Sequence, residues 1–187
     1  MNRSTRPLVA IAAAFAVLGA SQVAGGAQAA GQATAAGPQN QVQAARAATD
    51  QYHQLSTAKA AGYMKLVDVN GIACIAQPPM GAMGVHYVKA SMVGDAAVRL
   101  RHPEALVYRP TPKGLRLSAL EYVVLRKAWR AAHGPNAPRP MLYGHSFNFT
   151  PAGNRYGLPA FYSLHAWIWY ANPSGMFTMW NPQVNCP

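Results

Sequence analysis

One stretch of the chain, residues 161–170, constrains the fold most, because both of its alternating faces are apolar. As an extended strand it would place on one side Phe161, Ser163, His165, Trp167 and Trp169, and on the other Tyr162, Leu164, Ala166, Ile168 and Tyr170. A strand of this kind is buried on both faces, so it must lie in the interior of a covered sheet. It belongs to the segment 158–186, which holds the densest aromatic run in the chain. We therefore expect the remaining elements to form a scaffold around this segment.

The first 29 residues have the three-part pattern of a secretory signal peptide. Arg3 and Arg6 precede an apolar run of 13 residues, 8–20, which is followed by small residues ending in Ala27-Gln28-Ala29. A membrane anchor is the alternative, but 13 residues that rise about 1.5 Å each are too short for a hydrocarbon core of about 30 Å. We expect cleavage after Ala29 and a secreted or periplasmic protein that has no transmembrane segment once the signal is removed.

Composition favours one packed domain after the signal peptide. Residues 30–41 are rich in Ala, Gly, Gln and Pro without periodicity, which predicts a flexible arm. The remainder, residues 42–187, is long enough to form a single domain with a sizeable core. Aromatic residues make up 10% of the chain and charged residues only 11%, and this balance argues against disorder.

Periodicity and turn signals predict an α+β fold. Apolar positions at three-to-four spacing are typical of a helix that begins at residue 40 or 42, runs to 61 and ends at Gly62. Asn70-Gly71 and the loop Pro110–Gly114 are hairpin signals. Strands are expected at 63–69, 72–76, 85–90, 105–109, 115–123, 142–150 and 161–170, and a short basic helix at 125–133. The expected architecture is an N-terminal helix packed on a curled, mainly antiparallel sheet or a small barrel.

The two cysteines of the chain, Cys74 and Cys186, are expected to form one disulfide. An even number of cysteines in an exported protein favours this pairing. The bond would tie the C-terminal tail to the early part of the sheet and stabilise the fold by about 4–5 kcal/mol through loop closure. The alternative is a pair of free thiols that act as metal ligands, but no Cys-x-x-Cys spacing supports it.

Alternation on the predicted strands places several polar side chains inside. Between 115 and 123 one face would carry Leu115, Leu117, Ala119, Glu121 and Val123. A carboxylate on this face must be paired, hydrogen-bonded or bound to a metal, because burying it alone costs several kcal/mol. His165 lies among tryptophans, His86 lies in the middle of a strand, and His145 lies near the start of another. We expect an interior pocket lined by His86, Glu121, His165, His145 and Trp167.

Three interpretations of this group are open. Two neutral imidazoles and one carboxylate, from His86, His165 and Glu121, suit a divalent transition metal with open coordination positions. A metal-free hydrogen-bond network inside the core is the second interpretation. Copper is the third, because soft donors lie near His86 and near the end of the chain: Met80, Met83, Met92, Met176, Met179 and Trp180. These methionines lack a regular spacing and are equally typical of core packing.

The chain carries 16 Lys and Arg against 5 Asp and Glu, which favours anionic partners. It has no recognition helix, RNA-binding motif or zinc finger, so we expect no nucleic-acid partner and, at most, loose contact with an anionic cell envelope. It also lacks the GxSxG, P-loop and GxGxxG motifs, and none of its other acids is an obvious partner for Glu121 in a glycosidase pair. These absences argue against the corresponding enzyme classes.

Several segments of the chain resemble a set of small exported bacterial proteins of uncharacterised function. They are MGAMGVHYV (80–88), PEALVY (103–108), LSALEYVV (117–124), and LHAWIW with NPSGMF and WNP (164–182). The resemblance covers roughly residues 50–187. It implies a shared fold and brings no activity to carry over.

Three functions are consistent with these residues. The first is binding of a small molecule or a metal ion in an interior His/Glu pocket. The second is a His/Glu-dependent or metal-dependent enzyme that acts on a small apolar or aromatic substrate, with Glu121 as base or ligand. The third is an envelope-associated structural protein whose histidines only satisfy the core.

Overall fold

The computed structural model describes residues 37–187 of the protein. The expected signal peptide, residues 1–29, lies outside the described residues. The expected arm, residues 30–41, enters the described part at residue 37 and is helical from Pro38 onward. Within residues 37–187, no helix is both long enough and apolar enough to cross a membrane.

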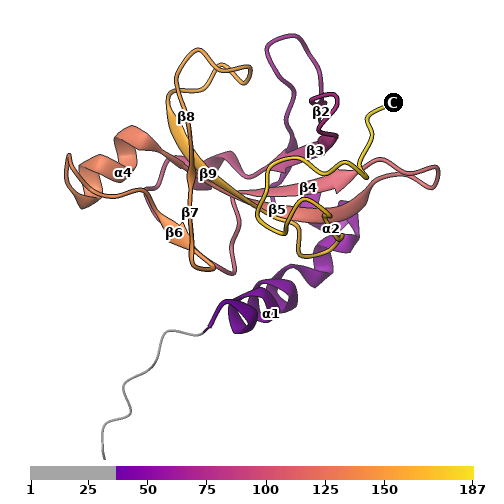
Figure 1. Ribbon diagram of the computed structural model, residues 1–187, viewed down its shortest axis with the longest axis horizontal. Helices are drawn as coiled ribbons and strands as arrows, with labels where there is room; N and C mark the ends of the chain where they lie inside the picture. Colours follow the sequence, from indigo (N-terminus) through magenta and orange to yellow (C-terminus); the bar gives the residue numbers. More distant parts are fainter. Residues whose placement is uncertain (1–36) are drawn as a thin grey trace, which may run out of the picture. The chain divides into compact units, whose positions relative to one another are not determined.

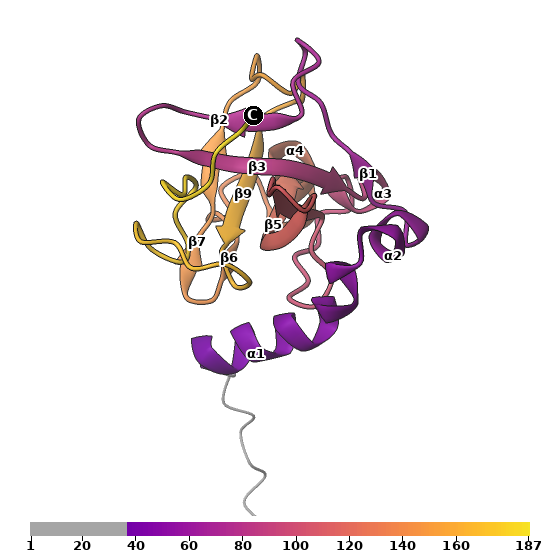
Figure 2. The ribbon, with the colours of Figure 1, turned by 90° about the vertical axis from the view of Figure 1, so that its right-hand side faces the viewer.

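Two short helices occupy the region where the sequence predicts one helix ending at residue 61. They are α1 (Pro38–Thr49) and α2 (Leu55–Ala60), with a 3-10 turn, η1 (Asp50–His53), between them. The break falls at Gln54, whose backbone is extended (φ −88°, ψ 107°) and cannot continue a helix. Figure 2 shows α1 running along one side of the sheet.

An antiparallel sheet of seven strands forms the centre of the fold (Figure 1). The strand order is β1-β3-β4-β5-β9-β8, and β2 also pairs with β3. The strands are β1 (Met64–Lys65), β2 (Cys74–Ala76), β3 (Ala82–Val88), β4 (Ala105–Arg109), β5 (Arg116–Leu125), β8 (Asn148–Thr150) and β9 (Phe161–Ala166). The other elements are α3 (Ala90–Val93), α4 (Arg126–His133) and a small hairpin of β6 (Met141–Leu142) and β7 (His145–Ser146). The α+β prediction with a mainly antiparallel sheet is confirmed, whereas the barrel alternative is wrong because the sheet is open between β1 and β8.

The strands β1 and β2 do not form the hairpin that Asn70-Gly71 predicts. Both pair with the same edge of β3, in the registers Lys65–Tyr87 and Cys74–Val85. They are therefore two parts of one edge strand, interrupted by an excursion at residues 67–73. Asp68 closes this excursion by accepting hydrogen bonds from the backbone N–H groups of Asn70 and Ile72. The Asn-Gly signal thus marks a local turn, and the strands on either side find their partner elsewhere.

Asp68 also fastens the excursion to the loop 151–160, which joins β8 to β9. The Arg155 guanidinium donates two hydrogen bonds to the Asp68 carboxylate, at 2.7 and 3.1 Å. The backbone N–H of Val69 donates to the carbonyl of Arg155 at 2.9 Å. Chiefly through the Arg155 hydrogen bond, the pKa of Asp68 is held below its usual value.

The predicted hairpin between β4 and β5 is present, but a β-bulge at Ser118 changes which residues share a face. The register pairs around it are Val107–Ala119 and Tyr108–Leu117, so Ser118 is an extra residue on β5. One extra residue reverses the alternation beyond the bulge. Leu115 and Leu117 therefore pack in the aromatic core, on the opposite face from Ala119 and Glu121. The expectation that all of these residues share one face is wrong.

The two faces of the sheet are covered differently. The first face packs large side chains of the central strands against the helical segment, and its members include Tyr87, Tyr108, Tyr122, Ala45 and Ala58. The second face carries a smaller cluster of mostly short side chains, namely Ala82, Val107, Ala119, Trp167 and Val184. As expected for an internal strand, β9 is buried along its whole length. Short side chains on the second face leave space above the sheet, and the candidate site lies there.

The C-terminal tail covers part of the second face. Ala82 and Asn181 form an isolated antiparallel bridge, with backbone hydrogen bonds of 3.1 Å in both directions. The predicted disulfide between Cys74 and Cys186 is present and joins residues 112 positions apart. By restricting the unfolded chain, a loop of this size contributes about 4–5 kcal/mol to stability.

Glu104, immediately before β4, is a buried acid that the sequence analysis missed. Its Oε2 accepts a hydrogen bond from the backbone N–H of Val123 at 2.9 Å, and its Oε1 has no hydrogen-bond partner in residues 37–187. Burial raises the pKa of Glu104 to about 8. The carboxyl group is therefore mostly protonated in the folded protein at neutral pH.

We predict that Glu104→Gln removes one component of the pH dependence of stability. The folded-state pKa of about 8 lies above the usual value of 4.5, so the native state retains a proton that the unfolded chain loses between these two values. The free energy of unfolding should therefore fall as the pH rises through this window, by up to about 1.4 kcal/mol per pH unit. Urea denaturation from pH 5 to pH 8 should show a shallower decline for Glu104→Gln, which keeps the hydrogen bond from Val123.

The control for this experiment is Asp50→Asn, a change at an exposed side chain on η1. It should keep the decline of the wild-type protein. An identical pH dependence in Glu104→Gln and wild type would contradict the role given to Glu104.

Candidate metal centre

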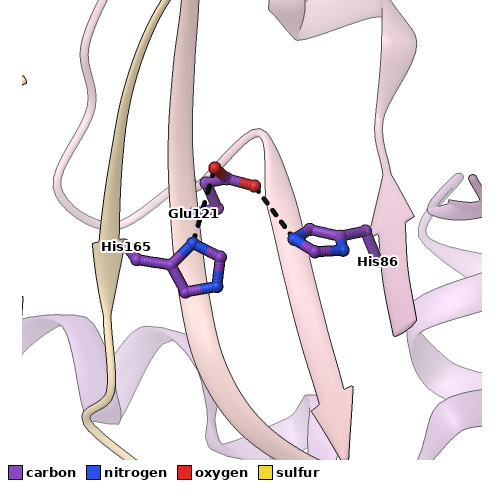
Figure 3. Close-up of side chains that lie close together, drawn as sticks. All are labelled: His86, Glu121 and His165. Carbon is purple, nitrogen blue, oxygen red and sulfur yellow. Dashed lines mark ion pairs between the residues drawn. The ribbon is translucent and has the colours of Figure 1, made fainter. Parts of the chain in front are cut away.

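Three side chains from three strands meet on the second face of the sheet: His86 of β3, Glu121 of β5 and His165 of β9 (Figure 3). We call them the His/Glu cluster. Glu121 and His165 lie opposite each other on neighbouring strands. His86 and Glu121 are on strands that β4 separates, about 9–10 Å apart, and they are offset along the sheet, because His86 pairs with Val107 of β4 whereas Glu121 pairs with Ala105. Their side chains therefore meet diagonally across β4, at a place where Ala105 carries only a methyl group.

The three groups lie close together in a buried setting. Nε2 of His86 is 3.1 Å from Oε2 of Glu121, and Nδ1 of His165 is 3.4 Å from Oε1 of Glu121. The exposed fractions of the His86, Glu121 and His165 side chains are 3%, 13% and 1%. One donor atom from each residue can be chosen so that all three lie within 4.8 Å of one another. The His/Glu cluster could therefore hold a metal ion.

All four ring nitrogens of His86 and His165 lack a hydrogen-bond partner among the described residues. Two of these nitrogens are close to Glu121 oxygens, but the rings do not direct an N–H along either contact. A buried polar atom without a partner costs free energy, and native proteins usually supply a ligand, an ion or a water molecule at such a place. The two imidazoles are therefore available to a water molecule, an ion or another ligand.

Glu121 is held in its ionised form. Burial by itself would raise the pKa of its carboxyl group, but the charges of His165 and His86 and their contacts with the carboxylate together outweigh burial. The pKa of Glu121 consequently lies well below its usual range. Such a carboxylate is a weak proton acceptor and a competent ligand for a cation.

Trp167 and His145, the other two residues expected in the pocket, have different positions. Trp167 is buried beside the cluster, with its ring 5.4 Å from that of His165, and its indole N–H donates to the carbonyl of Thr178. His145 is exposed on β7, where its ring lies 4.3 Å from that of Phe177. The structure does not bring His145 into the cluster, because β6 and β7 form a separate hairpin off the main sheet.

The methionines considered as copper ligands are divided between the surface and the interior. Three of them are exposed or partly exposed: Met80, Met92 and Met176. A small cavity of about 190 Å³ next to Glu121 is lined in part by Met83, Met179 and Trp180. Soft donors therefore approach the carboxylate from one side, and copper belongs among the metals to be tested.

A larger cavity of about 420 Å³ lies beside His86 and Glu121. Its floor is the second face of the sheet, and its walls come from β1, α3 and the loop 151–160. The lining is mostly apolar, and its few polar side chains are Lys65, His86, Glu121 and Tyr156. Burial, and to a smaller extent the nearby Glu121 charge, raises the pKa of Tyr156, so its phenol is neutral. The amino-acid sequence gives no sign of this cavity, because α3 and the loop 151–160 have no periodic pattern.

Comparison of the chain with protein-family models, with curated proteins and with solved structures found no match. The His/Glu cluster and the cavity beside it are therefore the features from which a function can be inferred.

We predict that the cluster behaves as a coupled unit in metal-free protein. After dialysis against EDTA, His165→Ala leaves the buried Glu121 carboxylate with a single imidazole neighbour and should lower the free energy of unfolding by about 3 kcal/mol. Adding Glu121→Gln should recover part of this loss, because a neutral amide needs no countercharge. Urea denaturation of both single variants and of the double variant measures the coupling.

The control is the surface pair of Asp95 and Arg99, whose side chains are far more exposed. Arg99→Ala should cost less than about 1 kcal/mol. Additive effects of the His165 and Glu121 substitutions would show that the two residues are not coupled and would contradict the prediction.

Proposed function

We propose that this protein binds a divalent first-row transition-metal ion through His86, Glu121 and His165, in the periplasm or outside the cell. The observation that carries the proposal is the convergence of one carboxylate and two buried imidazoles whose nitrogens have no hydrogen-bond partner in residues 37–187. Two histidines and one carboxylate form a donor set that suits ions such as Zn²⁺, Fe²⁺ and Co²⁺.

The spacing of the donor atoms supports a shared ion. Ligands that lie 2.0–2.2 Å from a metal are about 3.0–3.5 Å from their neighbours in an octahedral or tetrahedral arrangement. The distances from Nε2 of His86 to Oε2 of Glu121 and from Nδ1 of His165 to Oε1, 3.1 and 3.4 Å, fall in this range, so the imidazoles would share an ion with a carboxylate that presents both of its oxygens. Around such an ion each nitrogen lone pair points at the metal and not at the oxygen. This arrangement accounts for close contacts that lack an aligned N–H.

The charge state of Glu121 favours a ligand over a metal-free general base. The lowered pKa keeps Glu121 deprotonated in the metal-free protein, and a metal would bind this carboxylate together with neutral imidazoles, displacing any protons that they carry. A general base works best when its pKa lies near the working pH. Metal-free acid–base chemistry at Glu121 is therefore the weaker candidate.

Three protein ligands leave at least one coordination position for water or another ligand. The cavity of about 420 Å³ borders both His86 and Glu121, so the free positions would face a half-open, mostly apolar space. This combination supports a binding or catalytic centre more than a purely structural metal site, which is usually closed by four protein ligands.

A location outside the cytoplasm is supported by two features. The Cys74–Cys186 disulfide is typical of oxidising compartments, and residues 1–29 have the pattern of a signal peptide. The basic excess would favour contact with an anionic envelope. The mature chain must therefore be produced with its disulfide formed before metal binding is measured.

Metal content tests the proposal directly. The mature protein is incubated separately with Zn²⁺, Co²⁺, Fe²⁺, Mn²⁺ or copper, freed of excess metal by gel filtration, and analysed by inductively coupled plasma mass spectrometry. We expect about one equivalent of at least one of these metals. His86→Ala and His165→Ala should each weaken binding by at least about 100-fold, because each removes a ligand.

The matched control is His145→Ala, which removes an exposed histidine outside the cluster and should keep full uptake. If the wild-type protein takes up none of these metals in stoichiometric amount, the proposal is overturned. The cluster would then be a buried polar network of an envelope-associated structural protein.

A second variant tests the geometry without removing a ligand. Ala105→Leu places a larger side chain in the space where His86 and Glu121 meet, so metal affinity should fall by at least about tenfold. Ala90→Leu, a similar enlargement at an exposed position on the cavity wall, should leave the affinity unchanged. Urea denaturation shows whether both variants remain folded, and equal affinities in two folded variants would contradict the role given to Ala105.

A further inference from the structure

We infer that the cavity beside the His/Glu cluster binds a small molecule that has an apolar body and one oxygen or nitrogen donor atom, which coordinates the bound metal. The inference that the ligand has a donor atom depends on the proposed metal binding. The inference that it has an apolar body depends only on the cavity and can be tested without metal.

The size and lining of the cavity determine how large and how apolar a ligand can be. A volume of about 420 Å³ lies within the range of about 300–1,000 Å³ found for small-molecule sites. The sheet floor and the walls present branched aliphatic and aromatic groups, among them Leu66, Val88, Val93, Val123, Leu158 and Phe161. A ligand that covers these side chains removes apolar surface from water, which favours hydrocarbon or aromatic groups.

The polar side chains that line the cavity determine which polar group the ligand can carry. Glu121 is the most exposed member of the His/Glu cluster, and it borders the cavity together with His86 and the neutral phenol of Tyr156. A single donor atom placed there can fill an open position on the metal. A ligand with several charges would find one cation in the lining, Lys65, which is itself exposed to solvent. The lining therefore favours one polar end and argues against a multiply charged ligand.

The walls of the cavity are held in place by contacts between distant parts of the chain. Leu66 donates a backbone hydrogen bond to the carbonyl of His86, which fixes the wall formed by β1. The ion pair of Asp68 and Arg155 fixes the loop that carries Tyr156 and Leu158. A site whose walls are already positioned loses little conformational freedom on binding, which favours affinity.

The apolar body is tested on metal-free protein with N-phenyl-1-naphthylamine, an uncharged probe that fluoresces in apolar surroundings. We expect saturable binding of about one equivalent. Val93→Trp fills the cavity from α3 and should weaken this binding by at least about tenfold. Met141→Trp adds the same side chain at an exposed position outside the cavity and should leave binding unchanged. Val88→Phe replaces Val93→Trp if the latter is not folded.

The donor end is tested on Co²⁺-loaded protein with two hydroxamic acids that share a metal-binding group. Octanohydroxamic acid carries an alkyl chain that acetohydroxamic acid lacks. The visible absorption of Co²⁺ should shift with both, and the longer ligand should act at a concentration at least about tenfold lower, because each buried methylene adds affinity. Val93→Trp should remove most of this advantage.

The outcomes separate this inference from the proposed function. If Co²⁺ does not bind, the proposed function fails, and the inferred coordination of the ligand to the metal fails with it. The fluorescent probe then still tests whether the cavity binds an apolar group. If Co²⁺ binds but the two hydroxamic acids act at equal concentrations, or the probe fails to saturate or ignores Val93→Trp, the cavity is not the binding site and the inference is overturned.

Discussion

The buried carboxylate of Glu121 is the interaction on which the rest of the second face depends. A charge in this position is tolerated only with compensating partners, and the two imidazoles must come from strands on either side of β5. This requirement accounts for three features that otherwise look unrelated. β3 and β9 flank β4 and β5 in the sheet, Ala105 leaves a gap between His86 and Glu121, and the Ser118 bulge turns the carboxylate toward the histidines.

The bulge lets a single strand contribute to both faces of the sheet in different ways. Before Ser118, β5 contributes Leu117 to the aromatic core, and after it the alternation places Leu120 and Tyr122 in the same core and Glu121 on the other side. Without the extra residue, a strand that buries Leu117 on the aromatic face would turn Glu121 toward that face as well. The well-packed first face can thus hold the sheet rigid, while short side chains on the second face leave a cavity.

Much of the fold, and the central members of the site, could be predicted from sequence because they depend on local pattern. Alternation along residues 161–170 identified an internal strand, and the same reasoning placed His165 and Glu121 inside. The disulfide followed from an even cysteine count in a chain with a signal pattern. Each of these inferences needs only side-chain polarity and spacing within one short segment.

The remaining features depend on pairing between distant segments, which local pattern does not encode. The Asn70-Gly71 turn was recognised, but its flanking strands pair with β3 and not with each other. One residue added at Ser118 reversed the predicted face of Leu117, and no residue type marks such a bulge. The burial of Glu104 and the exposure of His145 follow from tertiary packing, and the cavity is walled by segments without periodicity.

The ion pair of Asp68 and Arg155 links two segments at the border of the cavity. Arg155 precedes Tyr156 in the loop that forms one wall, and the guanidinium is partly open to solvent while its carboxylate partner is covered. Salt or a competing anion can therefore screen this pair from outside. The pair joins the excursion in the edge strand to the loop over the sheet, so the strength of one partly exposed ion pair contributes to how firmly that cavity wall is held.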